Sequence, residues 1–108
     1  MNTYILDGRT PIAEPDLMKW ALWFETADRC VKDTEQGDVI VSTVFLGLDH
    51  SPGFPGQRPE LFETMIFVGG SSQGDCERYA TWEEAEAGHA RWVVKVFKPT
   101  PISDFLRQ

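Results

Sequence analysis

The chain has few of the residues that hold metals or form disulfides. Its 108 residues include two cysteines and two histidines, and neither pair has the spacing of a CxxC or HxxxH metal motif. Cys30 and Cys76 lie far apart in the sequence, and we expect both to be reduced, mostly buried thiols. The sequence therefore predicts no metal site and no cofactor.

Positive charge is also scarce. The chain carries 10 Lys and Arg against 17 Asp and Glu, which gives a net charge of −7. A protein that binds nucleic-acid polymers needs a basic surface for the phosphate backbone, so this class of partner is excluded. A small nucleotide is not excluded, because one or two arginines and a few backbone N–H groups can hold it.

Long apolar runs are absent, and none approaches the length of a membrane-spanning helix. The N-terminus has neither a basic start nor an apolar signal core. We therefore expect a protein of the cytoplasm with no membrane partner. The composition fits one globular domain over residues 1–98, followed by a proline-containing tail over residues 99–108.

The longest apolar run, VIVSTVFLGL at residues 39–48, is rich in β-branched and aromatic residues. It is apolar at odd and even positions alike, which favours a central strand covered on both faces. Residues 61–68 form a second strong strand. The loop between them, residues 49–60, holds three prolines and two glycines, and the simplest pairing of the two strands is antiparallel.

Two helices are predicted beside these strands. The first begins at Pro15, has Asp16 in its first turn and ends before Gly37. Its inward stripe would be Leu17, Trp20, Ala21, Phe24, Ala27 and Val31. The second begins with a capping box at Thr81 and runs to about residue 97. Its inward stripe would be Trp82, Ala85, His89, Trp92, Val93 and Val96.

Shorter elements complete the order. Residues 4–6 predict a strand that enters a turn at Asp7 and Gly8, and residues 76–80 predict an edge strand after a turn over residues 71–75. The predicted fold class is α+β, with an antiparallel sheet of three to five strands and two main helices packed on one face. Because the second face of the central strand needs another cover, we expect a homo-oligomer, a dimer or higher.

Candidate ligand-binding residues cluster where the central strand meets the long loop. Asp49 and His50 leave the strand together, and a histidine with a carboxylate is suited to ligand binding or to general base chemistry. Adjacent strand residues point to opposite faces, however, so the two need not touch. The alternative is that Asp49 starts the turn and His50 is a surface residue.

Asp28 and His89 each take a core-facing helical position where an apolar residue was expected. A buried carboxylate needs a partner, so the two residues could meet each other, either as a functional pair or as a satisfied structural one. Glu63 lies among apolar neighbours on the second strand. It could hold a ligand or pair with Arg58, Arg78 or Arg9. Arg58 and Arg78, near predicted loops, are candidate ligand-binding residues as well.

Four sequence blocks carry a resemblance: WALWFE at residues 20–25, VSTVFLGLDH at 41–50, LFETM at 61–65 and YATWEEAEAGH at 79–89. In their order and spacing the chain resembles a group of small proteins encoded by tailed phages, prophages and the bacteria that carry them. It departs from them at Val68, where glycine is expected, and after Lys98. The resemblance implies an origin in a phage and action in the bacterial host cytoplasm, and it implies no mechanism.

Three functions compete. The first is a non-enzymatic accessory protein that binds a small host-derived ligand, such as a nucleotide-like defence signal, or a host protein. The second is a protein-interaction or host-takeover module that uses Met18, Leu22 and the C-terminal tail. The third is a small hydrolase or transferase with His50 or His89 as base. We rank binding first, interaction second and catalysis third, with no catalytic residue assigned.

Overall fold

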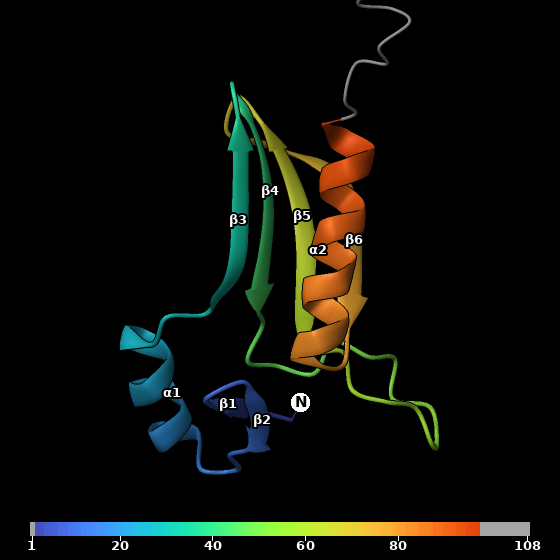
Figure 1. Cartoon of the computed structure of the whole chain (residues 1–108). Helices are drawn as coiled ribbons and strands as arrows, with labels where there is room; N and C mark the ends of the chain where they lie inside the picture. The colour runs from blue at the N-terminus through green and yellow to red at the C-terminus, as the bar shows by residue number, and fades with distance from the viewer. Residues whose placement is uncertain (1, 98–108) are drawn as a thin grey trace, which may run out of the picture.

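The computed structural model describes residues 2–97, without the side chains of Asp75 and Cys76. Figure 1 shows a twisted sheet with one long helix on its face and a smaller unit at its lower end. The elements in chain order are β1 (Tyr4–Asp7), β2 (Thr10–Ala13), α1 (Leu17–Thr26), β3 (Cys30–Gln36), β4 (Val39–Phe45), β5 (Phe62–Val68), β6 (Ser71–Tyr79) and α2 (Trp82–Val96).

The main sheet has four antiparallel strands in the order β3-β4-β5-β6. The predicted hairpin of β4 and β5 is confirmed, with Thr43 opposite Thr64 and Phe45 opposite Phe62. The predicted α+β fold class with a multi-stranded antiparallel sheet is therefore confirmed. The β1–β2 hairpin forms a second, two-stranded sheet, as its Asp-Gly turn indicated.

Strand β4 alternates in burial along its length. Val41, Thr43 and Phe45 are fully buried beneath α2, while Ile40, Ser42 and Val44 on the other face are half-buried. A central strand was predicted because both sets are largely apolar, and β4 is an interior strand of the sheet. Within residues 2–97 no helix covers the second face.

Helix α1 is shorter than the sequence predicted. It begins at Leu17, with the Asp16 carboxylate accepting hydrogen bonds from the Met18 and Lys19 amides, and it ends at Thr26 rather than near Gly37. The prediction of a helix through this segment was wrong, because residues 30–36 form strand β3. A two-residue turn with Gly37 at φ +62° then leads into β4.

The sequence predicted two helices on one face of the sheet, but only α2 lies there. Helix α1 lies beyond the end of the main sheet, beside the β1–β2 hairpin (Figure 1). It is held against the chain that leaves β4. The Trp20 indole N–H donates to the Gly47 carbonyl at 3.1 Å, and a Cβ on Gly47 would come within 3.1 Å of the Phe24 ring. Leu17, predicted to face inward, is 66% exposed.

Two further details differ from the sequence prediction. Strand β6 begins at Ser71, and the turn before it is made by Gly69 and Gly70 at φ +57° and +85°. Cys30, predicted to be mostly buried, is exposed. Loss of some hydration around the sulfur and the neighbouring Asp33 carboxylate raise the pKa of the Cys30 thiol. No helix within residues 2–97 is long and apolar enough to cross a membrane.

An aromatic core joins the two parts of the fold. Phe45, Leu61, Phe62, Tyr79 and Ala85 form its buried centre. The Trp23 ring meets the Phe45 ring edge-on, with 5.9 Å between the ring centres. The Trp82 ring meets the Phe62 ring in the same way, with 6.1 Å between the centres. Since Trp23 belongs to α1 and Trp82 to α2, these contacts tie both helices to the end of the sheet where β4 stops and β5 begins.

Candidate functional site

A chain of polar side chains crosses the sheet beneath α2. His89 of α2 lies at its centre and is only 2% exposed. Its Nε2 atom is 2.8 Å from the Thr34 hydroxyl of β3, and its Nδ1 atom is 2.7 Å from the Thr43 hydroxyl of β4. Thr43 is 2.6 Å from Thr64 of β5, which is 3.0 Å from the Tyr79 hydroxyl of β6. His89 thus joins α2 to β3 and β4 directly, and the chain of hydrogen bonds continues from Thr43 to β5 and β6.

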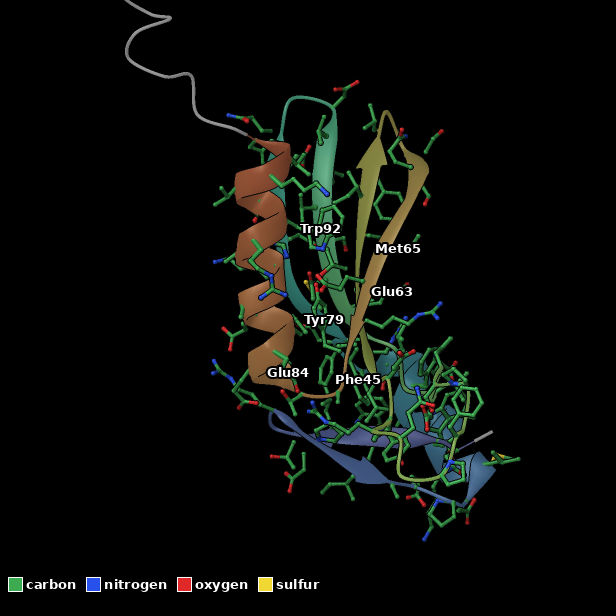
Figure 2. The ribbon with its side chains drawn as sticks, turned by 90° about the vertical axis from the view of Figure 1, so that its right-hand side faces the viewer. Phe45, Glu63, Met65, Tyr79, Glu84 and Trp92 are labelled. Carbon is green, nitrogen blue, oxygen red and sulfur yellow. The ribbon has the colours of Figure 1, made fainter. Side chains whose placement is uncertain are left out.

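The chain ends on the carboxylate of Glu77. Its Oε1 atom lies 3.0 Å from the Tyr79 hydroxyl and accepts a hydrogen bond from the Trp92 indole N–H, also at 3.0 Å. Figure 2 shows Tyr79 and Trp92 between α2 and the sheet. Because an ionised carboxylate only accepts, the Tyr79 proton points to Glu77. The Thr64 hydroxyl then donates to Tyr79, and the Thr43 hydroxyl donates to Thr64. His89 carries its proton on Nδ1 and donates it to Thr43, while its Nε2 atom accepts from the Thr34 hydroxyl.

The pKa values of the two ionisable rings fit this arrangement. Burial is the main cause that raises the pKa of Tyr79 to about 12, so its hydroxyl stays protonated. Burial also lowers the pKa of His89, and the charge of Lys32 lowers it further. A neutral imidazole has one donor and one acceptor, which is what Thr43 and Thr34 require.

The sequence of α2 places these groups. Thr81 caps the helix, its hydroxyl accepting a hydrogen bond from the Glu84 amide at 3.1 Å, as the capping box predicted. Ala85, Gly88 and His89 then form the buried stripe. Gly88 leaves room for the Tyr79 ring, with which any Cβ at this position would overlap.

A groove lies between α2 and β3, on one side of this chain. Its volume is about 520 Å³, within the range of roughly 300–1,000 Å³ that ligand pockets occupy. It is lined by Lys32 and Thr34 of β3 and by Glu86, His89, Ala90, Val93 and Val94 of α2. The groove is open because the facing side chains Thr34 and Ala90 are small. Val94 is 65% exposed beside it.

A smaller groove of about 250 Å³ lies on the other side of α2. It is lined by Glu77, Arg91, Trp92 and Lys95. The Lys95 ammonium lies 4.6 Å from the centre of the Trp92 ring, and the Arg91 guanidinium is 3.5 Å from the Glu77 carboxylate. Two cations and an indole face this groove in a protein that is acidic overall.

Asp49 and His50 hold the long loop closed and do not bond to each other. Asp49 Oδ1 accepts hydrogen bonds from the backbone amides of Ser51 and Glu60, at 2.8 and 3.0 Å. Burial opposes ionisation, but these two amides together hold the pKa of Asp49 below its ordinary value. The His50 Nδ1 atom lies 2.9 Å from the Leu48 carbonyl. The geometry is that of an Asx turn.

The suggested pairing of Asp28 with His89 is wrong. Asp28 lies outside α1 because the helix ends at Thr26, and its carboxylate accepts a hydrogen bond from the Cys30 amide at 3.0 Å. His89 bonds to two threonines instead. The prediction failed because it required the first helix to continue past residue 28.

Glu63 pairs with Arg78, one of the three arginines proposed for it. The Arg78 Nε atom is 2.9 Å from the Glu63 carboxylate, on the sheet face away from α2. Arg58 pairs with Glu84 at the start of α2. Both arginines line a shallow groove of about 270 Å³, so the structure brings Arg58 and Arg78 together, each with a glutamate already bound.

Sequence reasoning identified His89 and missed the five other members of its chain, Thr34, Thr43, Thr64, Tyr79 and Glu77. A signal for two of them was present: Thr43 and Thr64 are polar residues inside strands that are otherwise apolar. Cross-strand threonine pairs are a known stabilising contact of antiparallel sheets. Thr34 gave no such signal, because its strand was not predicted.

Among the side chains that the structure describes, no three from His, Cys, Asp or Glu come close enough together to hold a metal ion. Comparisons of the chain with protein-family models, with curated proteins and with solved structures find no match.

Proposed function

We propose that the chain is a non-enzymatic binding protein that captures an extended segment of a partner protein along β3. The observation that carries the proposal is the groove of about 520 Å³ between α2 and β3. It lies directly beside an edge of the main sheet. A segment added to β3 as a further strand would place every second side chain in this groove.

The position of β3 supports strand addition. Within residues 2–97, β3 pairs with β4 on one side and with no strand on the other. Figure 1 shows β3 at the outer edge of the sheet, away from β6. An edge strand offers a row of backbone N–H and C=O groups to an incoming chain. Backbone hydrogen bonds then supply affinity, and the pockets for alternate side chains supply specificity.

The states of the two histidines favour binding over catalysis. Both ring nitrogens of His89 have hydrogen-bond partners, and the residue is almost fully buried. The His50 ring bonds to a backbone carbonyl of its own loop. Neither ring is hydrogen-bonded to a carboxylate, the arrangement that a general base in a triad uses. A host protein as partner agrees with the phage-like sequence blocks.

Selection of peptides from a random displayed library tests this function. We expect binders to the wild-type chain, and we expect them to protect the backbone amides of β3 from hydrogen exchange. The variant Ala90→Trp fills the groove and should no longer bind the selected peptides. Ala87→Trp places the same side chain on an exposed position of α2 outside the groove and should still bind them. Binders that leave β3 unprotected would overturn the proposal.

A second candidate function rests on the smaller groove, where Arg91 and Lys95 flank the Trp92 indole. Two cations beside an aromatic ring suit a small nucleotide, whose base stacks on the ring while its phosphates meet the cations. A thermal-shift screen with nucleotides and cyclic dinucleotides tests it. A true ligand raises the melting temperature of the wild type and not of Arg91→Ala. No shift at saturating concentration excludes this function.

A further inference from the structure

Strand β3 has two chemically different sides. The register with β4 places Asp33 opposite Ser42 and Glu35 opposite Ile40, on the sheet face away from α2. Lys32 and Thr34 lie on the α2 side and line the groove. An incoming strand would therefore meet acids on one side and the groove on the other.

The two acids are exposed, and Asp33 has the neutral Cys30 thiol as a neighbour. Asp33 and Glu35 are both exposed, and none of the ion pairs among the described residues includes either of them. The neighbouring face of β4 offers them Ile40 and Ser42 and no cation. A cation brought by a partner strand would lie directly across from each acid.

Pairing of β3 with a second copy of itself is disfavoured by the same acids. A twofold axis perpendicular to the sheet keeps each residue on its own face. Centred on Thr34, it sets Asp33 opposite Glu35 twice. Centred on Asp33, it sets that residue opposite its own copy. Like charges directly opposite one another destabilise a strand pair, and charged edge residues are a common device against self-pairing.

The opposite side of the incoming strand meets an apolar wall. Ala90, Val93 and Val94 form one stripe of α2 along the groove, and Val94 is largely exposed. Apolar side chains directed into the groove would cover this stripe and gain the free energy of burial. Strand geometry sends successive side chains to opposite sides, so apolar and basic residues must alternate.

Building on the proposed strand addition, we propose that the segment captured by β3 alternates apolar residues, which fill the groove, with Lys or Arg, which face Asp33 and Glu35. The net charge of −7 attracts such a segment over a longer range and raises its association rate at low salt. The partner is therefore a protein with a basic, amphipathic, extended segment.

Fluorescence anisotropy with labelled synthetic peptides tests this. The peptides match the 7 residues of β3 and alternate Val with Lys, Val with Glu, or Ser with Lys. We expect the Val/Lys peptide to bind about tenfold more tightly than either of the others. The Val/Glu peptide sets like charges opposite Asp33 and Glu35, and the Ser/Lys peptide buries less apolar surface in the groove. The double variant Asp33→Lys/Glu35→Lys should reverse the preference between Val/Lys and Val/Glu.

A control separates this effect from general attraction to an acidic protein. Asp7→Lys/Glu83→Lys makes the same change in net charge at two exposed acids outside β3 and should leave the preference unchanged. Equal loss of Val/Lys binding in both double variants would overturn the proposed chemistry.

The outcomes also separate this proposal from the proposed function. If Val/Lys and Val/Glu peptides bind equally and both protect β3 from hydrogen exchange, strand addition stands and the charge rule is wrong. If none of the three peptides protects β3 and the displayed library yields no binder that does, both proposals are wrong.

Discussion

Gly88 of α2 rests against the ring of Tyr79 from β6, and a Cβ atom at residue 88 would overlap that ring. The contact sets the distance between helix and sheet at the level of the buried hydrogen-bond chain. His89, the next residue, can reach Thr43 only because α2 approaches the sheet this closely. Gly88 therefore helps to position His89.

The substitution Gly88→Ala should destabilise the protein, although alanine is the better helix former. In an open helical position it would add about 1 kcal/mol to the free energy of unfolding. Here overpacking against Tyr79 should lower that free energy by about 1–3 kcal/mol. Urea denaturation measures the change. The reverse substitution at the exposed neighbour, Ala87→Gly, should cost only about 1 kcal/mol. A stabilised Gly88→Ala variant would show that the helix stands further from Tyr79.

The pair of Thr43 and Thr64 should behave as a coupled unit. Both are fully buried, and their hydroxyls are 2.6 Å apart. Replacing either one with valine leaves a buried partner without its hydrogen bond, at a cost of about 1–3 kcal/mol. The double variant should cost less than the sum by about 1 kcal/mol, as measured by urea denaturation of all four proteins. Strict additivity would mean that the hydroxyls do not interact.

Much of this fold could be predicted because its central elements carry strong local signals. The apolar, β-branched runs of β4 and β5 and the capping box of α2 each indicate one structure. Strand β3 carries no such signal: of its 7 residues, all but Val31 and Thr34 are exposed, and Lys, Glu and Gln favour a helix. The Gly37-Asp38 turn was the one local sign of a hairpin, and the pairing with β4 that follows this turn decides the structure of β3.

The candidate site was predictable in part for the same reason. His89 was found because it interrupts an apolar stripe on a helix that was correctly placed. Its two hydrogen-bond partners come from two strands, β3 and β4, and β3 was predicted as helix. Asp28 was assigned as its partner by helical spacing alone, and that assignment failed when the helix ended at Thr26. The groove depends on small side chains on two elements, a property that appears only when both are in place.

Stability should fall as the solution becomes mildly acidic, because of His89. Its pKa in the folded chain lies below the ordinary value, chiefly through burial, whereas the unfolded chain titrates near the ordinary value of about 6.5. The unfolded state therefore binds a proton more readily, and lowering the pH through this value favours unfolding. Urea denaturation from pH 7.5 to 5.5 should show the loss. His89→Gln should be less stable at pH 7.5 and show a flatter pH dependence; equal slopes would contradict this.

The outer surface of α1 predicts self-association. Leu17, Met18 and Leu22 are 66%, 69% and 61% exposed, so residues 2–97 leave this apolar patch uncovered. We expect light scattering to give a mass above that of one chain for the wild type, and the mass of one chain for Met18→Glu/Leu22→Glu. Since both side chains are exposed, the double variant should change the free energy of unfolding of the single chain by no more than about 1 kcal/mol.

The matched control for this patch is Thr10→Glu/Gln73→Glu, which adds the same charge at two exposed polar residues outside α1. It should keep the wild-type mass, because charge alone does not cover or uncover the patch. If the control also dissociates, repulsion between acidic chains is the cause and the patch is not the contact. A wild type with the mass of one chain at every concentration would assign Leu17, Met18 and Leu22 no part in self-association.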